Sequence, residues 1–70
     1  MSKAEAIEAM KDGKKVTHRY FSPEEWMTMK KSYLEGWMIH LEDSVICSPA
    51  EFWRWRTDPT FDTDWSIYME

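Results

Sequence analysis

Residues 13–26 constrain the fold most, because they contain the end of one helix, a strand and the start of another helix. Gly13 predicts the helix end, since a residue in the left-handed backbone conformation is least strained when it has no Cβ. Residues 14–20 predict a strand, with two β-branched residues followed by two aromatic or imidazole rings and an arginine. Ser22 predicts the next helix start, because a proline follows it and Glu25 stands three residues further on. The chain therefore changes from helix to strand and back within fourteen residues.

The segments on either side carry the same kinds of signal. Residues 2–12 predict a helix that places Ile7 and Met10 on its buried face and begins with a capping box between Ser2 and Glu5. The expected strands cover residues 14–20, 26–31, 37–41, 45–47 and 65–68, and a loop is expected over residues 30–36.

The expected fold is α+β, in one small domain over residues 1–70. The sheet is expected to be antiparallel with about four strands, because Asp43 and Ser44 predict a hairpin turn between two strand-like runs. Ser48, with a proline after it and a glutamate at position 51, predicts a short helix before the last strand. In the first arm of the hairpin, His40 is expected on the more solvated face.

Aromatic residues are too numerous for the interior of so short a chain. Five tryptophans, three tyrosines and three phenylalanines occur in 70 residues, and a core of this size rarely supplies more than roughly 3–5 kcal/mol of stability. The single cysteine cannot form an internal disulfide. Some rings should therefore lie at the surface, where they favour self-association first and a ligand-binding face second.

The charge balance disfavours a nucleic-acid partner. Nine basic residues stand against 13 acidic ones, a formal charge of −4, and no basic stripe is present. The sequence has no signal peptide and no apolar run near 18 residues, so we expect no membrane association and a cytoplasmic location.

Catalytic and metal-binding patterns are missing from the sequence, so we expect neither an enzyme nor a cofactor. His18, His40 and Cys47 lack the spacing of metal ligands, and the two glycines do not form a phosphate loop. Cys47 on a hairpin arm is expected to be a small buried hydrophobic residue. Glu24 and Glu25 are explained by their place in a helix start, where negative charge is favoured.

Two clusters combine arginine with aromatic rings and are candidates for ligand binding. Residues 17–20 place a hydroxyl, an imidazole, a guanidinium and a phenol in succession, so that arginine can bind a phosphate and a ring can stack on a base. Residues 53–56 alternate tryptophan and arginine. For this second cluster we favour a structural role, with one tryptophan in the core and the arginines covering it and pairing with Asp58, Asp62 or Asp64. For the first, structural and binding roles remain open.

Both ends of the chain resemble a family of small phage and prophage proteins, the Thoeris anti-defence protein 2-like family. Residues 4–16 are similar to the opening of that family, in which a helix leads to glycine, basic residues and a strand. Residues 62–68 are similar to its closing motif, and Asp64 and Trp65 match it as they stand. His18 falls where the family has an arginine, and Phe21 falls where it has a tryptophan.

The resemblance implies a small α+β subunit that assembles into a homo-oligomer and holds a cyclic signalling nucleotide in pockets shared between subunits. Such a protein sequesters the nucleotide without hydrolysing it and so silences a bacterial immune signal. A phage-encoded protein of this kind would act in the host bacterial cytoplasm. The residues expected to form the ligand site are His18, Arg19, Tyr20, Trp26, Asp64 and Trp65.

Two other functions stay open on the sequence. The chain could instead block a host defence protein, such as a nuclease or immune effector, through an aromatic surface, because interfaces favour tryptophan, tyrosine and arginine. It could also be an oligomeric phage accessory subunit whose rings all lie in the core and interface.

Overall fold

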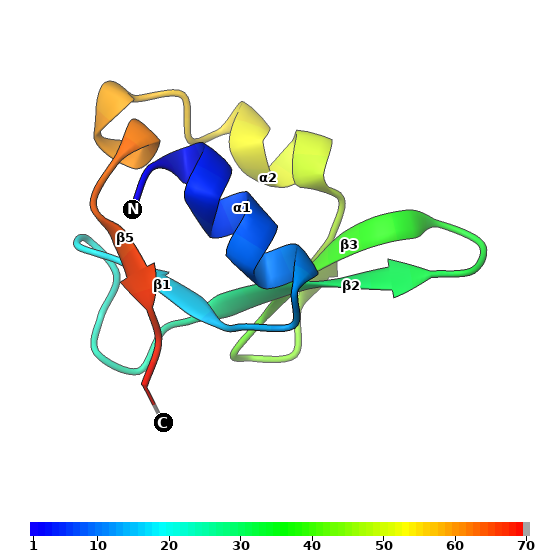
Figure 1. Cartoon of the computed structure of the whole chain (residues 1–70). Coiled ribbons are helices and arrows are strands. Elements are labelled where there is room, and N and C mark those ends of the chain that lie inside the picture. Colours follow the sequence, from blue (N-terminus) through cyan, green and yellow to red (C-terminus); the bar gives the residue numbers. More distant parts are fainter. Residues whose placement is uncertain (70) are drawn as a thin grey trace.

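A computed structural model describes residues 1–69 of the chain and confirms the α+β fold (Figure 1). Its five strands form one antiparallel sheet in the order β4-β3-β2-β1-β5, one strand more than the expected four or so. The elements in chain order are α1 (Lys3–Lys11), β1 (Val16–His18), β2 (Met27–Ser32), β3 (Gly36–Leu41), β4 (Ile46–Cys47), α2 (Pro49–Arg54), the 3₁₀ helix η1 (Pro59–Asp62) and β5 (Trp65–Ile67).

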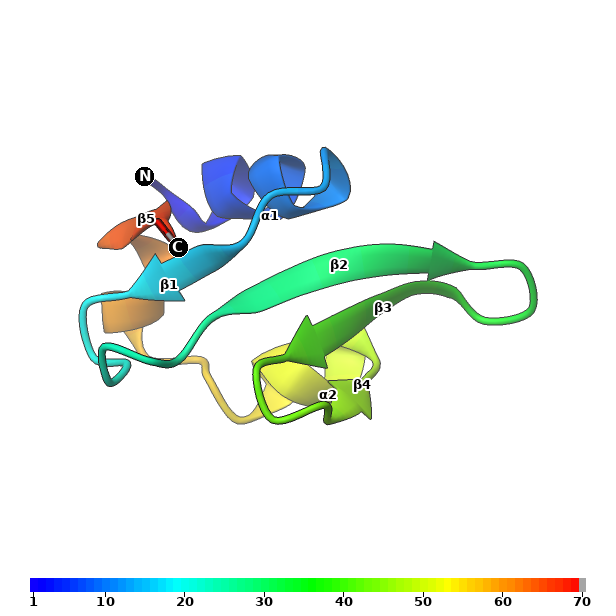
Figure 2. The same ribbon diagram turned by 90° about the horizontal axis from the view of Figure 1, so that it is seen from below.

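Helices α1 and α2 cover the same face of the sheet (Figure 1). Seen from below, after a turn of 90°, no helix of the described residues passes in front of the strands (Figure 2). Side chains alternate between the two faces of a strand, so each strand contributes every second residue to the covered face. The core on that face consists of Ala6, Met10, Val16, Met27, Met29, Ile39, Phe52 and Trp65.

Strands β1 and β2 pair through a single pair of residues. Only Val16 and Met27 pair across this boundary, whereas β2 and β3 pair over six positions and project together as a long hairpin (Figure 2). On the other side of β1, all three residues pair with β5, and Val16 lies opposite Ile67. The last strand thus joins the sheet beside the first one.

Two boundaries differ from the sequence prediction around β2. Ser22 begins a single turn instead of a helix, although Glu25 Oε1 accepts hydrogen bonds from both the backbone N–H and the hydroxyl of Ser22 (3.1 and 2.8 Å). Residues 30–32, expected in a loop, continue β2. The physical reason is the same for both, because Met27 and Met29 are buried against β3 and hold the chain extended directly after the turn.

The second arginine–tryptophan cluster has the structural role that we favoured. Trp53 packs against the core, whereas Trp55 is exposed. The Arg56 guanidinium lies 3.9 Å from the centre of the Phe52 ring and donates a hydrogen bond to the Phe52 carbonyl (3.2 Å). Asp64, one of the expected partners of this cluster, pairs with Arg19 instead.

Helix α1 begins with the predicted capping box. The Ser2 N–H donates to Glu5 Oε1 (2.9 Å), and the Glu5 N–H donates to the Ser2 hydroxyl (3.1 Å). Hydrogen bonding of the Glu5 carboxylate, first to the Ser2 backbone N–H and then to the Ser2 side chain, lowers the pKa of Glu5, because it favours the ionised form.

We expect the capping box to make stability depend on pH in a defined direction. A carboxyl group with a lowered pKa in the folded state stabilises the fold above its ordinary pKa and loses this contribution as the pH falls through the folded-state value. Glu5→Gln should therefore flatten the acid limb of a plot of unfolding free energy against pH. Glu8→Gln, on the same helix but outside the box, is the matched control. An unchanged acid limb in Glu5→Gln would exclude this contribution.

Candidate functional site

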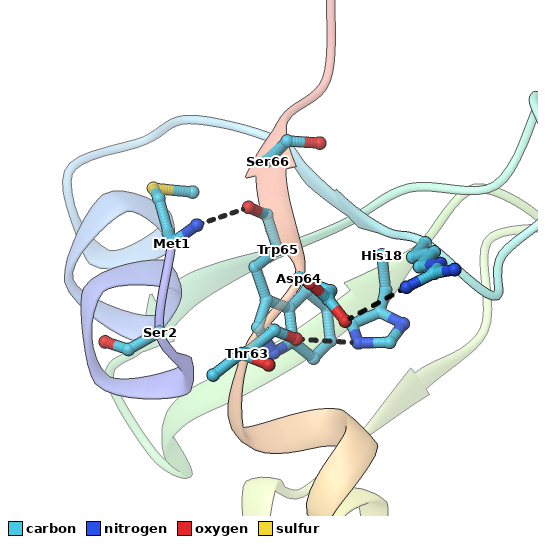
Figure 3. Close-up of a pocket in the computed structure, with 8 residues that line it drawn as sticks. Met1, Ser2, His18, Thr63, Asp64, Trp65 and Ser66 are labelled. Carbon is cyan, nitrogen blue, oxygen red and sulfur yellow. Dashed lines mark hydrogen bonds and ion pairs between the residues drawn. The ribbon is translucent and has the colours of Figure 1, made fainter.

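An open hollow of about 650 Å³ lies where the start of α1 meets the ends of β1 and β5 (Figure 3). It brings together four residues of the site expected from the sequence. The residues that line it are Met1, Ser2, His18, Arg19, Thr63, Asp64, Trp65 and Ser66. A ligand in this hollow would thus touch the first two residues of the chain and the start of β5.

His18 is buried beneath the hollow, and both of its ring nitrogens are used inside the protein. The backbone N–H of Tyr20 donates to Nδ1 (3.1 Å), so the ring hydrogen must lie on Nε2. Nε2 is 2.8 Å from the Thr60 carbonyl oxygen and 2.9 Å from that of Thr63, and it donates to this pair. Figure 3 shows the bond to Thr63. The imidazole therefore ties β1 to the segment that leads into β5.

Trp65 presents its backbone to the hollow and its indole to the core. The indole N–H donates to the Phe61 carbonyl (2.9 Å), and the ring centre lies 4.7 Å from that of His18 in an edge-on arrangement. The Trp65 carbonyl accepts from the Met1 nitrogen at 2.7 Å, and its N–H donates to the Met1 carbonyl at 3.2 Å (Figure 3). The indole expected to stack on a ligand base thus packs the interior, and only the backbone is available at the hollow.

Arg19 and Asp64 form the charged rim. The Arg19 guanidinium lies 3.9 Å from the Asp64 carboxylate, and the two side chains are 69% and 44% exposed. Asp64 has a left-handed backbone conformation (φ 68°), which aspartate tolerates better than most residues, and its carbonyl accepts from the Arg19 N–H at 3.1 Å. An exposed ion pair at this distance contributes little stability, so Arg19 can exchange its partner at small cost.

Tyr20 and Trp26 do not line this hollow. The Tyr20 ring is 63% exposed, and its centre lies 5.8 Å from the Arg19 guanidinium. It therefore stands beside the rim. Trp26 lies in a second hollow on the uncovered face of the sheet, where the Lys15 ammonium is 4.2 Å from the indole centre.

Several residues around the hollow were not expected from the sequence. Met1, Ser2, Thr63 and Ser66 line it mainly because the start of α1 lies beside β5. No local pattern indicates that contact.

Other reactive groups have separate surroundings. Burial, followed by the negative charge of Glu51, raises the pKa of the Cys47 thiol, which disfavours the reactive thiolate. Within residues 1–69, no three histidine, cysteine or acidic side chains are grouped so that they could hold a metal ion. The helices of the same region are all too short or too polar to cross a membrane.

No protein-family model, curated protein or solved structure matches this chain. The site is therefore interpreted from its own geometry.

Proposed function

We propose that this chain is a phage-type anti-defence protein that sequesters a small cyclic nucleotide at an interface between identical subunits, without catalysis. The observation that carries the proposal is the position of Arg19. Its exposed guanidinium stands between one loosely paired carboxylate and the exposed Tyr20 ring, at the rim of an open hollow. The resemblance of both chain ends to the anti-defence family agrees with this function.

The chemistry of the rim suits a phosphate and a base. A guanidinium binds phosphate through two parallel hydrogen bonds, and a phosphate oxygen would replace the Asp64 carboxylate as its partner. The adjacent Tyr20 ring offers a face for stacking. His18 and Trp65 serve this proposal as supports. The hydrogen bond of His18 to Thr63 fixes β1 against the segment that carries Asp64, and that of the Trp65 indole to Phe61 fixes β5 against η1.

A second copy of the chain would complete the site. Small-molecule pockets usually enclose most of the ligand surface, and this hollow is open to solvent on one side. Exposed apolar residues elsewhere, including Val45, Ile46 and Trp55, supply surface for self-association. The proposal therefore requires a solution mass that is a multiple of 8.5 kDa.

Arg19→Ala is expected to weaken nucleotide binding by at least about tenfold, because it removes charge-assisted hydrogen bonds to the phosphate. Isothermal titration against cyclic dinucleotides and cyclic ADP-ribose isomers would measure the loss. Arg54→Ala is the matched control, since Arg54 is an exposed arginine beside the Trp55 ring and does not line the hollow. Binding heat that is absent for every nucleotide, with an assembled and folded protein, would refute the proposal.

One observation favours a second function, the blocking of a host immune protein. Tyr33 is 101% exposed and Leu34 nearly as much, at the turn between β2 and β3. This turn forms the tip of the projecting hairpin (Figure 2). Aromatic side chains presented in this way are common anchors in protein interfaces. Stoichiometric capture of one bacterial protein, lost in the double variant Tyr33→Ser and Leu34→Ser, would favour this function over nucleotide capture.

A further inference from the structure

Asp64 is held beside Arg19 by its main chain as well as by its charge. Its carbonyl oxygen accepts a hydrogen bond from the Arg19 N–H (3.1 Å), and the carbonyl of the preceding residue, Thr63, accepts one from His18 Nε2 (2.9 Å). The Asp64 carboxylate lies 3.9 Å from the guanidinium, as a dashed line in Figure 3 shows. A ligand that displaces the carboxylate from Arg19 leaves these main-chain bonds intact. The displaced carboxylate therefore stays close to whatever Arg19 binds.

The charged groups at the hollow act against each other. Arg19 and Asp64 carry the charged side chains of its lining, and the Met1 nitrogen, which also lies there, donates to the Trp65 carbonyl (2.7 Å). An anion bound to the guanidinium is therefore repelled by the carboxylate beside it. The Asp64 side chain is 44% exposed, so water weakens this repulsion without removing it.

The strength of the repulsion depends on the kind of phosphate. A phosphodiester carries one negative charge, whereas a phosphomonoester carries about two at neutral pH because its second pKa is about 6. Coulomb repulsion is proportional to the charge, so Asp64 opposes a monoester about twice as strongly as a diester. Even at the dielectric constant of water, one additional unit charge at about 5 Å weakens binding roughly fourfold.

We propose that Asp64 is a specificity-determining residue, which favours phosphodiesters over phosphomonoesters in the hollow. The inference rests on the proposed function, because it needs a phosphate bound at Arg19. Within that function, the guanidinium supplies affinity for any phosphate, and the carboxylate reduces this affinity most for ligands that end in a phosphate group. Cyclic nucleotides have no terminal phosphate, so the ion pair selects them over linear nucleotides that have one.

Asp64→Asn removes the charge and little else. The two side chains have nearly the same shape, and asparagine tolerates the left-handed conformation of this position (φ 68°) as well as aspartate does. The hydrogen bond from the Arg19 N–H is retained, because its acceptor is the main-chain carbonyl. Asp62→Asn is the matched control, since Asp62 is exposed, lies two positions earlier and does not line the hollow.

The test is an amide NMR titration with three adenine nucleotides near neutral pH. Adenosine 3′,5′-cyclic monophosphate and the methyl ester of adenosine 5′-monophosphate have one negative charge, and the 5′-monophosphate itself has about two. We expect Asp64→Asn to improve the affinity for the 5′-monophosphate by at least about threefold more than that for its methyl ester. The cyclic ligand should gain no more than the methyl ester, because charge is the variable. Asp62→Asn should change no affinity by more than about twofold.

The possible results separate this inference from the proposed function. An equal gain for all three ligands would show that Asp64 only competes for Arg19, and a loss for all three would show that it accepts a hydrogen bond from the ligand. Either result would overturn the role of Asp64 in specificity and leave the nucleotide site in place. If none of these ligands and no cyclic dinucleotide binds the unaltered protein, the proposed function fails and this inference fails with it.

Discussion

Trp65→Ala is expected to leave most of the chain unfolded at room temperature. Trp65 is almost completely buried, and its ring packs against those of His18, Phe21 and Trp53. Truncation of a buried tryptophan costs about 3–5 kcal/mol, which equals the roughly 3–5 kcal/mol that a core of this size supplies. Urea denaturation followed by far-ultraviolet circular dichroism would measure the loss.

Two further variants separate packing from surface effects. Trp65→Phe keeps an aromatic ring but removes the hydrogen bond to the Phe61 carbonyl, so its cost should be clearly smaller than that of alanine. Trp55→Ala should change the free energy of unfolding by less than about 0.5 kcal/mol, because the Trp55 ring is exposed. A fold that tolerated Trp65→Ala as well as Trp55→Ala would contradict the arrangement of the core.

His18→Leu is expected to have the second largest effect, with a loss of about 3 kcal/mol in the free energy of unfolding. Leucine fills a similar space, but it leaves the carbonyl oxygens of Thr60 and Thr63 and the N–H of Tyr20 without their partner. Thermal or urea denaturation would measure this cost. His18→Asn, which retains donor and acceptor atoms on a shorter side chain, should recover part of it.

The other histidine provides the control for this experiment. His40 lies on the uncovered face of the sheet and is only half-buried. His40→Leu should therefore change stability much less than His18→Leu. Similar losses in the two variants would mean that the hydrogen bonds of His18 do not hold η1 and β5 in place.

Local sequence signals were sufficient for most elements of the fold. The helix expected over residues 2–12 is α1, and the Ser2 capping box is present as predicted. The hairpin turn at Ser44 also formed, with Ser44 in the left-handed conformation (φ 71°) that such turns use. These features depend on interactions between residues at most four positions apart, so a local sequence pattern is enough to predict them.

The failures occurred where a distant contact decided the structure. Ser22 and Glu25 form the local hydrogen bonds of a helix start, yet no helix follows. Burial of Met27 and Met29 beside β3 favours a strand there instead. The end of β2 was missed for a similar reason, since β2 continues to Ser32 by pairing with β3. Pairing partners of this kind cannot be deduced from alternation alone.

Four of the six residues expected at the candidate site lie together, but Tyr20 and Trp26 do not line the hollow, and the orientation of the side chains was not predicted. Arg19 and Asp64 do lie together, and His18 and Trp65 are beside them. The sequence could not indicate that β5 joins the sheet beside β1, which turns the Trp65 indole and the His18 imidazole into the core. The second hollow, at Trp26, was missed for the same reason, because its lining comes from three different strands and the segments beside them.

The position of β5 also determines when the protein can fold during its synthesis. The core needs Trp65, and Trp65 reaches its place only by pairing with His18, which lies 47 positions earlier in the chain. Contacts between such distant residues form late, because a long loop must close before they stabilise anything. A nascent chain that is still being extended therefore lacks the indole that fills its centre. Folding should therefore wait until β5 has been synthesised, and chains truncated before β5 should be substrates for proteases.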